Sequence, residues 1–138
     1  MNYTLKEIKS CSATAENPDA LSGQGGKANN GRKGCPCVEP LAAGVTKTLL
    51  HKLGSGTIRK IWCTIPPEHP EHLRNLILRM YWDGQEIPSV EVPLGDFFGI
   101  AHGRQKNMVT PYVGMQDAKG FNCFIPMPFQ KEVMISIE

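Results

Sequence analysis

The sequence predicts an all-β protein, a single jelly-roll β-sandwich preceded by a glycine-rich loop. From residue 41 onward, apolar and polar side chains alternate with the period of two that is typical of β-strands. Glycine and proline turns separate these runs, and hardly any segment has the 3.6-residue period of a helix. Several short strands with such turns favour a sandwich, because two sheets can bury their apolar faces against one another.

The chain is expected to divide at about residue 40. Residues 10–40 are rich in Ser, Ala, Gly and Asn, so this stretch has few apolar side chains with which to build a core. We therefore expect residues 1–40 to form an N-terminal extension with a long loop, or to be disordered. The glycines lack the GxxxxGK[ST] spacing of a phosphate loop. Residues 41–138 are expected to form the jelly-roll domain.

The strands of this domain are predicted in order from the alternation of side chains. The expected strands are 45–53, 57–65, 73–82, 89–94, 107–115, 121–129 and 131–137, and a polar connection at 67–72 could hold one helical turn. In the strand 73–82, residues 76, 78, 80 and 82 would share one face, with Arg79 and Tyr81 on the other. Pro126 and Pro128 fall in the run 121–129, and because proline donates no ladder hydrogen bond, we expect an edge or a bulge there.

Composition and charge exclude several classes of function. Apolar residues make up 41% of the chain and charged residues 20%, and the net charge of +2 does not indicate nucleic-acid binding. No apolar run approaches the roughly 20 residues needed to cross a bilayer. The N-terminal residues 1–9 contain no apolar signal core, so we expect a cytoplasmic protein.

Five cysteines form an odd set that does not suggest a disulfide framework: Cys11, Cys35, Cys37, Cys63 and Cys123. Cys35 and Cys37 form a CxC pair, which is tighter than the usual zinc spacing and would need two further ligands. Reduced thiols are the favoured interpretation, with Cys63 and Cys123 packed as small hydrophobic side chains. The sequence thus assigns neither a metal site nor a cofactor.

Four motifs in a fixed order suggest a family. They cover Gly54–Trp62, Leu76–Gly84, Pro88–Gly99 and Gly120–Phe129. Together they resemble the N-terminal half of the DUF2961 proteins, which include glycoside hydrolase family 172. The stretch Ser12–Gly34 also resembles that family's glycine-rich N-terminal loop. The similarity covers nearly the whole chain, from about residue 10 to residue 138.

The resemblance implies a double jelly roll that assembles as trimers and cleaves or rearranges furanoside linkages with two glutamates. It places those glutamates in a second jelly roll of about 150 residues, which we expect this chain to lack, so no catalytic residue is carried over. The resemblance therefore implies a module that is not catalytic alone, that acts as a homo-oligomer, trimeric or larger, and that could hold a carbohydrate ligand. The alternative is a truncated or split glycoside hydrolase acting on furanosides, with its glutamates on a missing half or a partner chain.

The carboxylates of this chain leave a third hypothesis open, a complete small hydrolase. Retaining hydrolysis needs two carboxyl groups about 5–5.5 Å apart, and Glu91, Asp96 and Glu16 are the candidates. Glu91 lies on an expected strand and Asp96 in the loop that follows it. The simpler interpretation is that Glu91 faces solvent, that Asp96 caps its own turn and that Asp83 serves a hairpin turn.

The expected ligand-binding residues combine charge with positions in loops. They are His102, Arg104, Asp96, Glu16 and Asn17. His102 could contact a substrate, and Arg104 could bind a hydroxyl or carboxylate group or form an exposed salt bridge. Trp62 and Trp82 could stack on sugar rings, although their alternation with Leu and Ile favours packing in the core.

Overall fold

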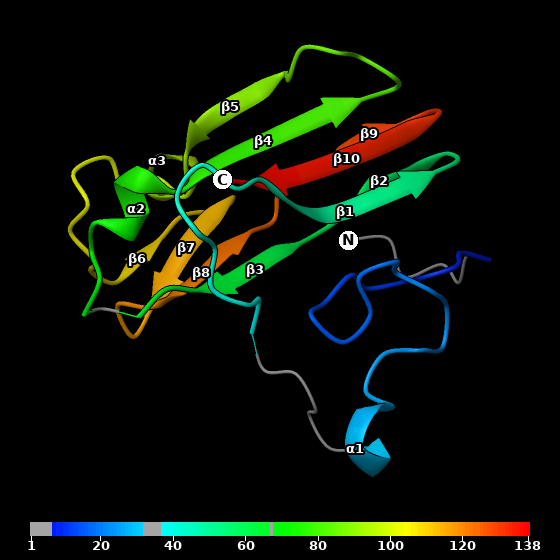
Figure 1. Ribbon diagram of the computed structural model, residues 1–138, viewed down its shortest axis with the longest axis horizontal. Coiled ribbons are helices and arrows are strands. Elements are labelled where there is room, and N and C mark those ends of the chain that lie inside the picture. The colour runs from blue at the N-terminus through cyan, green and yellow to red at the C-terminus, as the bar shows by residue number, and fades with distance from the viewer. Residues whose placement is uncertain (1–6, 32–36, 67) are drawn as a thin grey trace. The chain divides into compact units, whose positions relative to one another are not determined.

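The computed structural model describes residues 7–31, 37–66 and 68–138 and divides into two compact units, Met1–Pro40 and Leu41–Glu138 (Figure 1). The described part of the N-terminal unit is mostly irregular. It contains one isolated bridge between Thr14 and Asn17 and one short turn, α1 (Ala28–Gly31), in which Asn29 and Asn30 have left-handed φ values of 51° and 55°. Asparagine tolerates this conformation better than most residues.

The described residues of the C-terminal unit form three antiparallel sheets and two short helices. The first sheet has the order β1 (Lys47–Leu53), β10 (Glu132–Ile137), β4 (Ile77–Trp82) and β5 (Val90–Pro93). A two-stranded sheet joins β2 (Gly56–Ile58) to β9 (Met127–Phe129). The last sheet has the order β3 (Ile61–Thr64), β8 (Gly120–Cys123), β7 (Val113–Gln116) and β6 (Met108–Val109). The helices are α2 (His72–Asn75) and α3 (Leu94–Phe97).

The pairing is nested, because β1, β2 and β3 pair in turn with β10, β9 and β8. This double strand passes from one four-stranded sheet to the other through β2 and β9, and the hairpins β4–β5 and β6–β7 complete the two sheets (Figure 1). The missing side chain of Gly56 lets the Phe129 ring of the paired strand pack close to the backbone, since a Cβ there would lie 2.7 Å from the ring. The predicted all-β sandwich is thereby confirmed.

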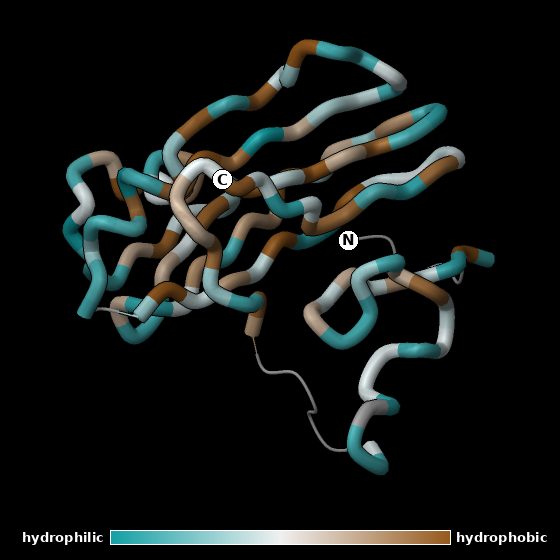
Figure 2. Tube along the Cα trace, in the orientation of Figure 1, coloured by the Kyte–Doolittle hydropathy of each residue, from teal (hydrophilic) through white to brown (hydrophobic). Residues whose placement is uncertain are grey.

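The core lies between the two four-stranded sheets and takes side chains from both. Met80 of β4 and Val133 of β10 face Met115 of β7 and Phe121 of β8, and all four are completely buried. Figure 2 shows hydrophobic and hydrophilic residues interspersed along these strands, as expected when each strand has one buried face. The predicted alternation in β4 is confirmed, because Leu78 and Met80 are buried.

Several predicted strands are shorter than expected, for identifiable reasons. The run 57–65 splits into β2 and β3 and the run 121–129 into β8 and β9, because β2 and β9 form a separate two-stranded sheet; the run 107–115 splits into β6 and β7. The predicted strand 73–82 begins as α2, because Leu73 buries its side chain against α3 rather than in a sheet. The helical turn expected at 67–72 thus lies later, at His72–Asn75.

Asp83 has a wider role than the predicted hairpin turn. With φ values of 54° and 84°, Asp83 and Gly84 form a tight turn after β4. The Oδ1 atom of Asp83 also accepts hydrogen bonds from the backbone N–H groups of Lys131 at 2.7 Å, Gln130 at 2.8 Å and Glu132 at 3.3 Å. These hydrogen bonds lower the pKa of Asp83 below its usual value, and the bond from Lys131 has the largest effect. The carboxylate therefore links the turn after β4 to the turn between β9 and β10.

Candidate functional site

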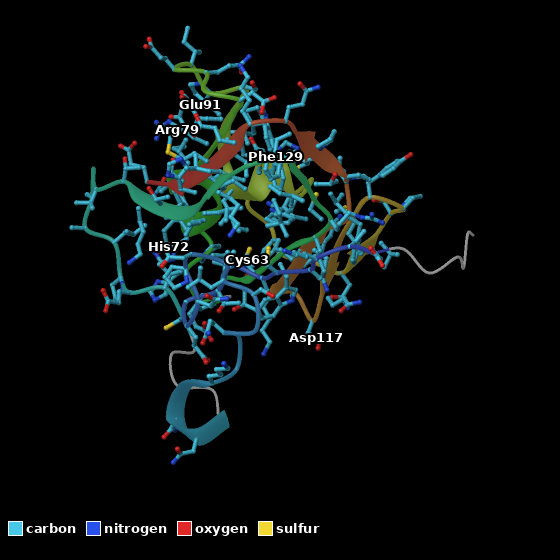
Figure 3. The ribbon with its side chains drawn as sticks, turned by 90° about the vertical axis from the view of Figure 1, so that its right-hand side faces the viewer. Cys63, His72, Arg79, Glu91, Asp117 and Phe129 are labelled. Carbon is cyan, nitrogen blue, oxygen red and sulfur yellow. The ribbon has the colours of Figure 1, made fainter. Side chains whose placement is uncertain are left out.

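Glu91 lies on the exposed side of β5, opposite Arg79 of β4. The Nε atom of Arg79 donates to Glu91 Oε2 at 3.0 Å, and its Nη1 atom donates to Glu138 Oε2 at 2.6 Å. Figure 3 shows Arg79 and Glu91 side by side. The two carboxylates raise the pKa of the Arg79 guanidinium, and Glu138 has the larger effect. The expectation that Glu91 lies on the solvated face of its strand is confirmed.

Asp96 lies in the first turn of α3 and forms an ion pair with Arg74 of α2. The same Nη1 atom of Arg74 donates to the carbonyl of Ala101 at 3.3 Å. The interpretation of Asp96 as the cap of its own turn is wrong, because α3 has no side-chain cap and the carboxylate reaches across to α2. Arg74 thereby joins α2, α3 and the loop after α3.

The suggested pair of Glu91 and Asp96 is therefore held by arginines of two different elements, β4 and α2. A sugar hydroxyl that approached either carboxylate would compete with a guanidinium group already bonded to it. Both carboxylates therefore serve in ion pairs, and this arrangement does not favour a role for them in acid–base catalysis.

His102 and Arg104 are exposed on the loop that follows α3. Gly103 between them has a φ of 64°, and a Cβ there would lie 3.6 Å from Arg74 Cγ and 3.8 Å from the Pro70 carbonyl oxygen. The loop therefore passes against α2, next to the ion pair of Asp96. Among the residues that the structure describes, neither side chain forms an ion pair. Both are accessible for a ligand, as the sequence interpretation requires.

Glu16 and Asn17 belong to the N-terminal unit. Asn17 is buried, and its Nδ2 atom donates to the carbonyls of Ser12 at 3.0 Å and Leu21 at 3.1 Å. Its Oδ1 atom accepts from the Leu21 N–H at 3.1 Å. Glu16 is half-buried beside it, and its N–H donates to Thr14 Oγ1 at 3.3 Å. The amide of Asn17 is thus used to hold its own loop together.

Residues 69–72 form a cluster that the sequence interpretation missed. His69 Nδ1 lies 3.2 Å from Glu71 Oε1, and the rings of His69 and His72 stack with centroids 5.0 Å apart. The pKa of Glu71 lies below its usual value, first because of a hydrogen bond with its own backbone N–H and further because of His69 and His72. The signal was the HxxH spacing of the two histidines, which the prediction treated only as a polar connection.

An exposed aromatic surface lies on the sheet β3–β8–β7–β6, and we call Trp62, Tyr112 and Phe124 the outer aromatic face. Trp62 is 56% exposed, Tyr112 62% and Phe124 48%. Trp62 pairs with Asn122, which pairs with Gly114, and the Phe124 N–H donates to the Tyr112 carbonyl at 2.7 Å. The interpretation of Trp62 as a core residue is wrong, because Cys63 turns inward and Trp62 therefore points outward. Trp82 does pack against the core.

The cysteines divide by exposure. Cys11 and Cys37 are exposed, whereas Cys123 is buried and Cys63 is half-buried. Burial raises the pKa of the Cys63 thiol to about 12, so this thiol is a poor nucleophile. The prediction that Cys63 and Cys123 pack as small hydrophobic side chains is confirmed. The metal interpretation of the CxC pair depends on Cys35, which lies outside the described residues.

Fold and side chains together define an all-β sandwich module in which Glu91 and Asp96 are ion-paired and the second sheet carries exposed aromatic residues. Residues 38–138 match the family model described as GH172 domain-like. Because the match covers most of the chain, this chain belongs to that family, and the relationship predicted from its motifs is confirmed. A search of curated proteins gives no match. Within the described residues, no helix has the length and apolar character needed to span a membrane.

Proposed function

We propose that this chain is a GH172-type β-sandwich module that acts by assembling with copies of itself and does not hydrolyse glycosides alone. The observation that carries the proposal is the outer aromatic face. Val109, at 86% exposed, continues the row Trp62–Asn122–Gly114 onto β6. Clustered apolar side chains on a sheet face mark interaction surfaces, because they lose unfavourable contact with water when a partner covers them.

The choice of a second copy as partner rests on the family resemblance, which implies trimers. The lack of independent catalysis rests on the ion pairs of Glu91 with Arg79 and of Asp96 with Arg74. A general acid or nucleophile must reach the glycosidic bond with its own oxygens, and here those oxygens contact guanidinium groups.

The test is the solution mass from light scattering during size-exclusion chromatography under reducing conditions. We expect a discrete trimer or larger closed assembly for the unaltered chain and a monomer for the double variant Trp62→Ser and Phe124→Ser. Ile87→Ser is the matched control, because Ile87 is 80% exposed but lies in the loop between β4 and β5. A monomeric unaltered chain, or an assembly that the double variant leaves intact, would contradict the proposal.

Activity on 4-nitrophenyl furanosides tests the second half of the proposal. We expect no hydrolysis by the purified chain. Hydrolysis abolished by Glu91→Gln or Asp96→Asn would identify a complete small enzyme instead. Hydrolysis that needs an added second chain would identify the split glycoside hydrolase.

A second candidate function, carbohydrate binding, is favoured by the exposure of Trp62. An exposed indole can stack on the C–H face of a sugar ring. Furanoside oligosaccharides titrated into the chain should perturb the NMR signal of the Trp62 indole and leave that of Trp82 unchanged. Equal or absent perturbation would exclude this site.

A further inference from the structure

The turn before α2 and the first residue of α2 bring two imidazoles and one carboxylate together. The ligand atoms of His69, Glu71 and His72 all lie within 4.8 Å of one another. His69 Nδ1 is 3.2 Å from Glu71 Oε1, and the imidazole planes of His69 and His72 are inclined by only 24°. We propose that these three side chains bind one divalent transition-metal ion, with zinc as the expected metal.

The local backbone explains why the two histidines meet. The N–H of His69 donates to the Pro66 carbonyl at 3.2 Å, and the N–H of His72 donates to the His69 carbonyl at 3.1 Å. The N–H of Leu73 donates to the Pro70 carbonyl at 3.1 Å. Each of these bonds closes a turn in which residues i and i+3 lie close together. His69 and His72 have this spacing, so their rings are superposed.

The donor set suits zinc. Two imidazole nitrogens and one carboxylate oxygen are common zinc ligands, with bonds of about 2.0–2.1 Å in a tetrahedral arrangement. Neighbouring ligand atoms in such a site lie about 3.3 Å apart, as follows from those bond lengths. The contact of His69 with Glu71 already has this spacing. The side chains of His69 and Glu71 are 58% and 54% exposed, so small rotations can bring the third ligand into range.

The proposed ligands lie on or next to α2, which is packed firmly against α3. Leu73, next to His72, is completely buried, and a Cβ on Gly95 would lie only 2.9 Å from its Cβ, so α2 packs closely on α3. The ion pair of Arg74 with Asp96 holds the same two helices. A site on an anchored turn loses less conformational freedom on binding than one on a free loop. Three protein ligands leave the remaining coordination position to water or to an external ligand.

The test is calorimetric titration of zinc into the full-length chain in which Cys11, Cys35 and Cys37 are replaced by serine, so that thiols cannot supply the site. We expect one zinc ion per chain, with affinity at least tenfold weaker in His69→Ala and in His72→Ala. Glu71→Gln, which preserves shape, should weaken binding by a smaller factor. His51→Ala is the matched control, because His51 Nε2 also lies 3.2 Å from a carboxylate, Glu132 Oε2, but belongs to no three-ligand group in the described residues.

Folding of the variants and the location of the bound metal are checked separately. Unaltered melting temperatures without zinc would show that the variants fold, as expected because none of the three positions is buried in the core. Cobalt should broaden backbone NMR signals most strongly around residues 69–73. The proposal is overturned if the chain that lacks Cys11, Cys35 and Cys37 does not bind zinc, if adding His69→Ala or His72→Ala to it leaves the affinity unchanged, or if the broadening centres elsewhere.

Discussion

The contact between α2 and α3 depends on the missing side chain of Gly95. A Cβ at this position would lie 2.9 Å from Leu73 Cβ, 3.0 Å from the Leu73 carbonyl oxygen and 3.1 Å from the Ile100 carbonyl oxygen. These neighbours are backbone atoms or the first atom of a buried side chain, so none can rotate away. We therefore expect Gly95→Ala to push α2 from α3 and to destabilise the C-terminal unit.

Two opposing terms set the magnitude. Alanine is favoured over glycine in a helix by roughly 0.5–1 kcal/mol. Adding a carbon to a closely packed contact costs typically about 1–3 kcal/mol, and three contacts at once place Gly95 in the upper part of that range. The free energy of unfolding should fall by about 1–2 kcal/mol. For a domain of about 100 residues this lowers the melting temperature by roughly 5–15 °C.

The assay is urea unfolding followed by circular dichroism, with Gly120→Ala as the matched control. A Cβ on Gly120 would lie 3.4 Å from the Gln116 carbonyl oxygen, which is an ordinary contact, so this variant should unfold near the midpoint of the parent chain. A Gly95→Ala variant as stable as the parent, or more stable, would refute the steric argument and show that α2 and α3 can separate at no cost.

Three further outcomes follow from burial and charge. Because the pKa of Asp83 is lowered in the folded state, its carboxylate stabilises the fold at pH values above the ordinary aspartate pKa of about 3.9, and this stabilisation is lost as the pH falls through the lower folded-state pKa. Asp83→Asn should therefore lower the free energy of unfolding at pH 7. In urea titrations, the variant should also lose less stability than the parent chain below about pH 4. Trp62→Ala should cost about 0.5 kcal/mol or less and Trp82→Ala about 2–4 kcal/mol, measured by the same unfolding assay. Iodoacetamide at pH 8 should alkylate Cys11 well before Cys63, as read by peptide mass, and equal rates would contradict the raised pKa of Cys63.

Periodicity predicted the strands because burial on one face of a sheet imposes a period of two. The alternation in 131–137 located β10 closely, since Val133, Ile135 and Ile137 all enter the core. Periodicity could not show where a strand passes from one sheet to another. The pairing of β2 with β9, with Gly56 against the Phe129 ring, joins residues that are far apart in sequence, so local periodicity does not reveal it.

The candidate site was harder to predict, because partners decide what a charged side chain does. Glu91 was expected on a polar face and lies there, but its partner Arg79 is fixed by the register of β4 with β5. The partner of Asp96 is Arg74 of α2, in a segment predicted as a strand, so no local rule could have supplied it. Trp62 was assigned to the wrong face because the register of β3 with β8, which turns Cys63 inward, is a tertiary property.

The outward faces of the two four-stranded sheets differ in polarity, and this difference indicates which face binds a partner. On β4 and β5, Arg79 and Glu91 form an ion pair, a surface that water solvates well. On β3 and the residue after β8, Trp62 and Phe124 are exposed instead, and polar residues normally occupy the water-facing side of an antiparallel sheet. Glu91→Gln should therefore leave the assembly mass unchanged, whereas the Trp62→Ser and Phe124→Ser double variant should reduce it to that of a monomer. A reduced mass for Glu91→Gln would place the contact between copies on the β4–β5 face. It would then contradict the assignment of the aromatic face as the binding surface.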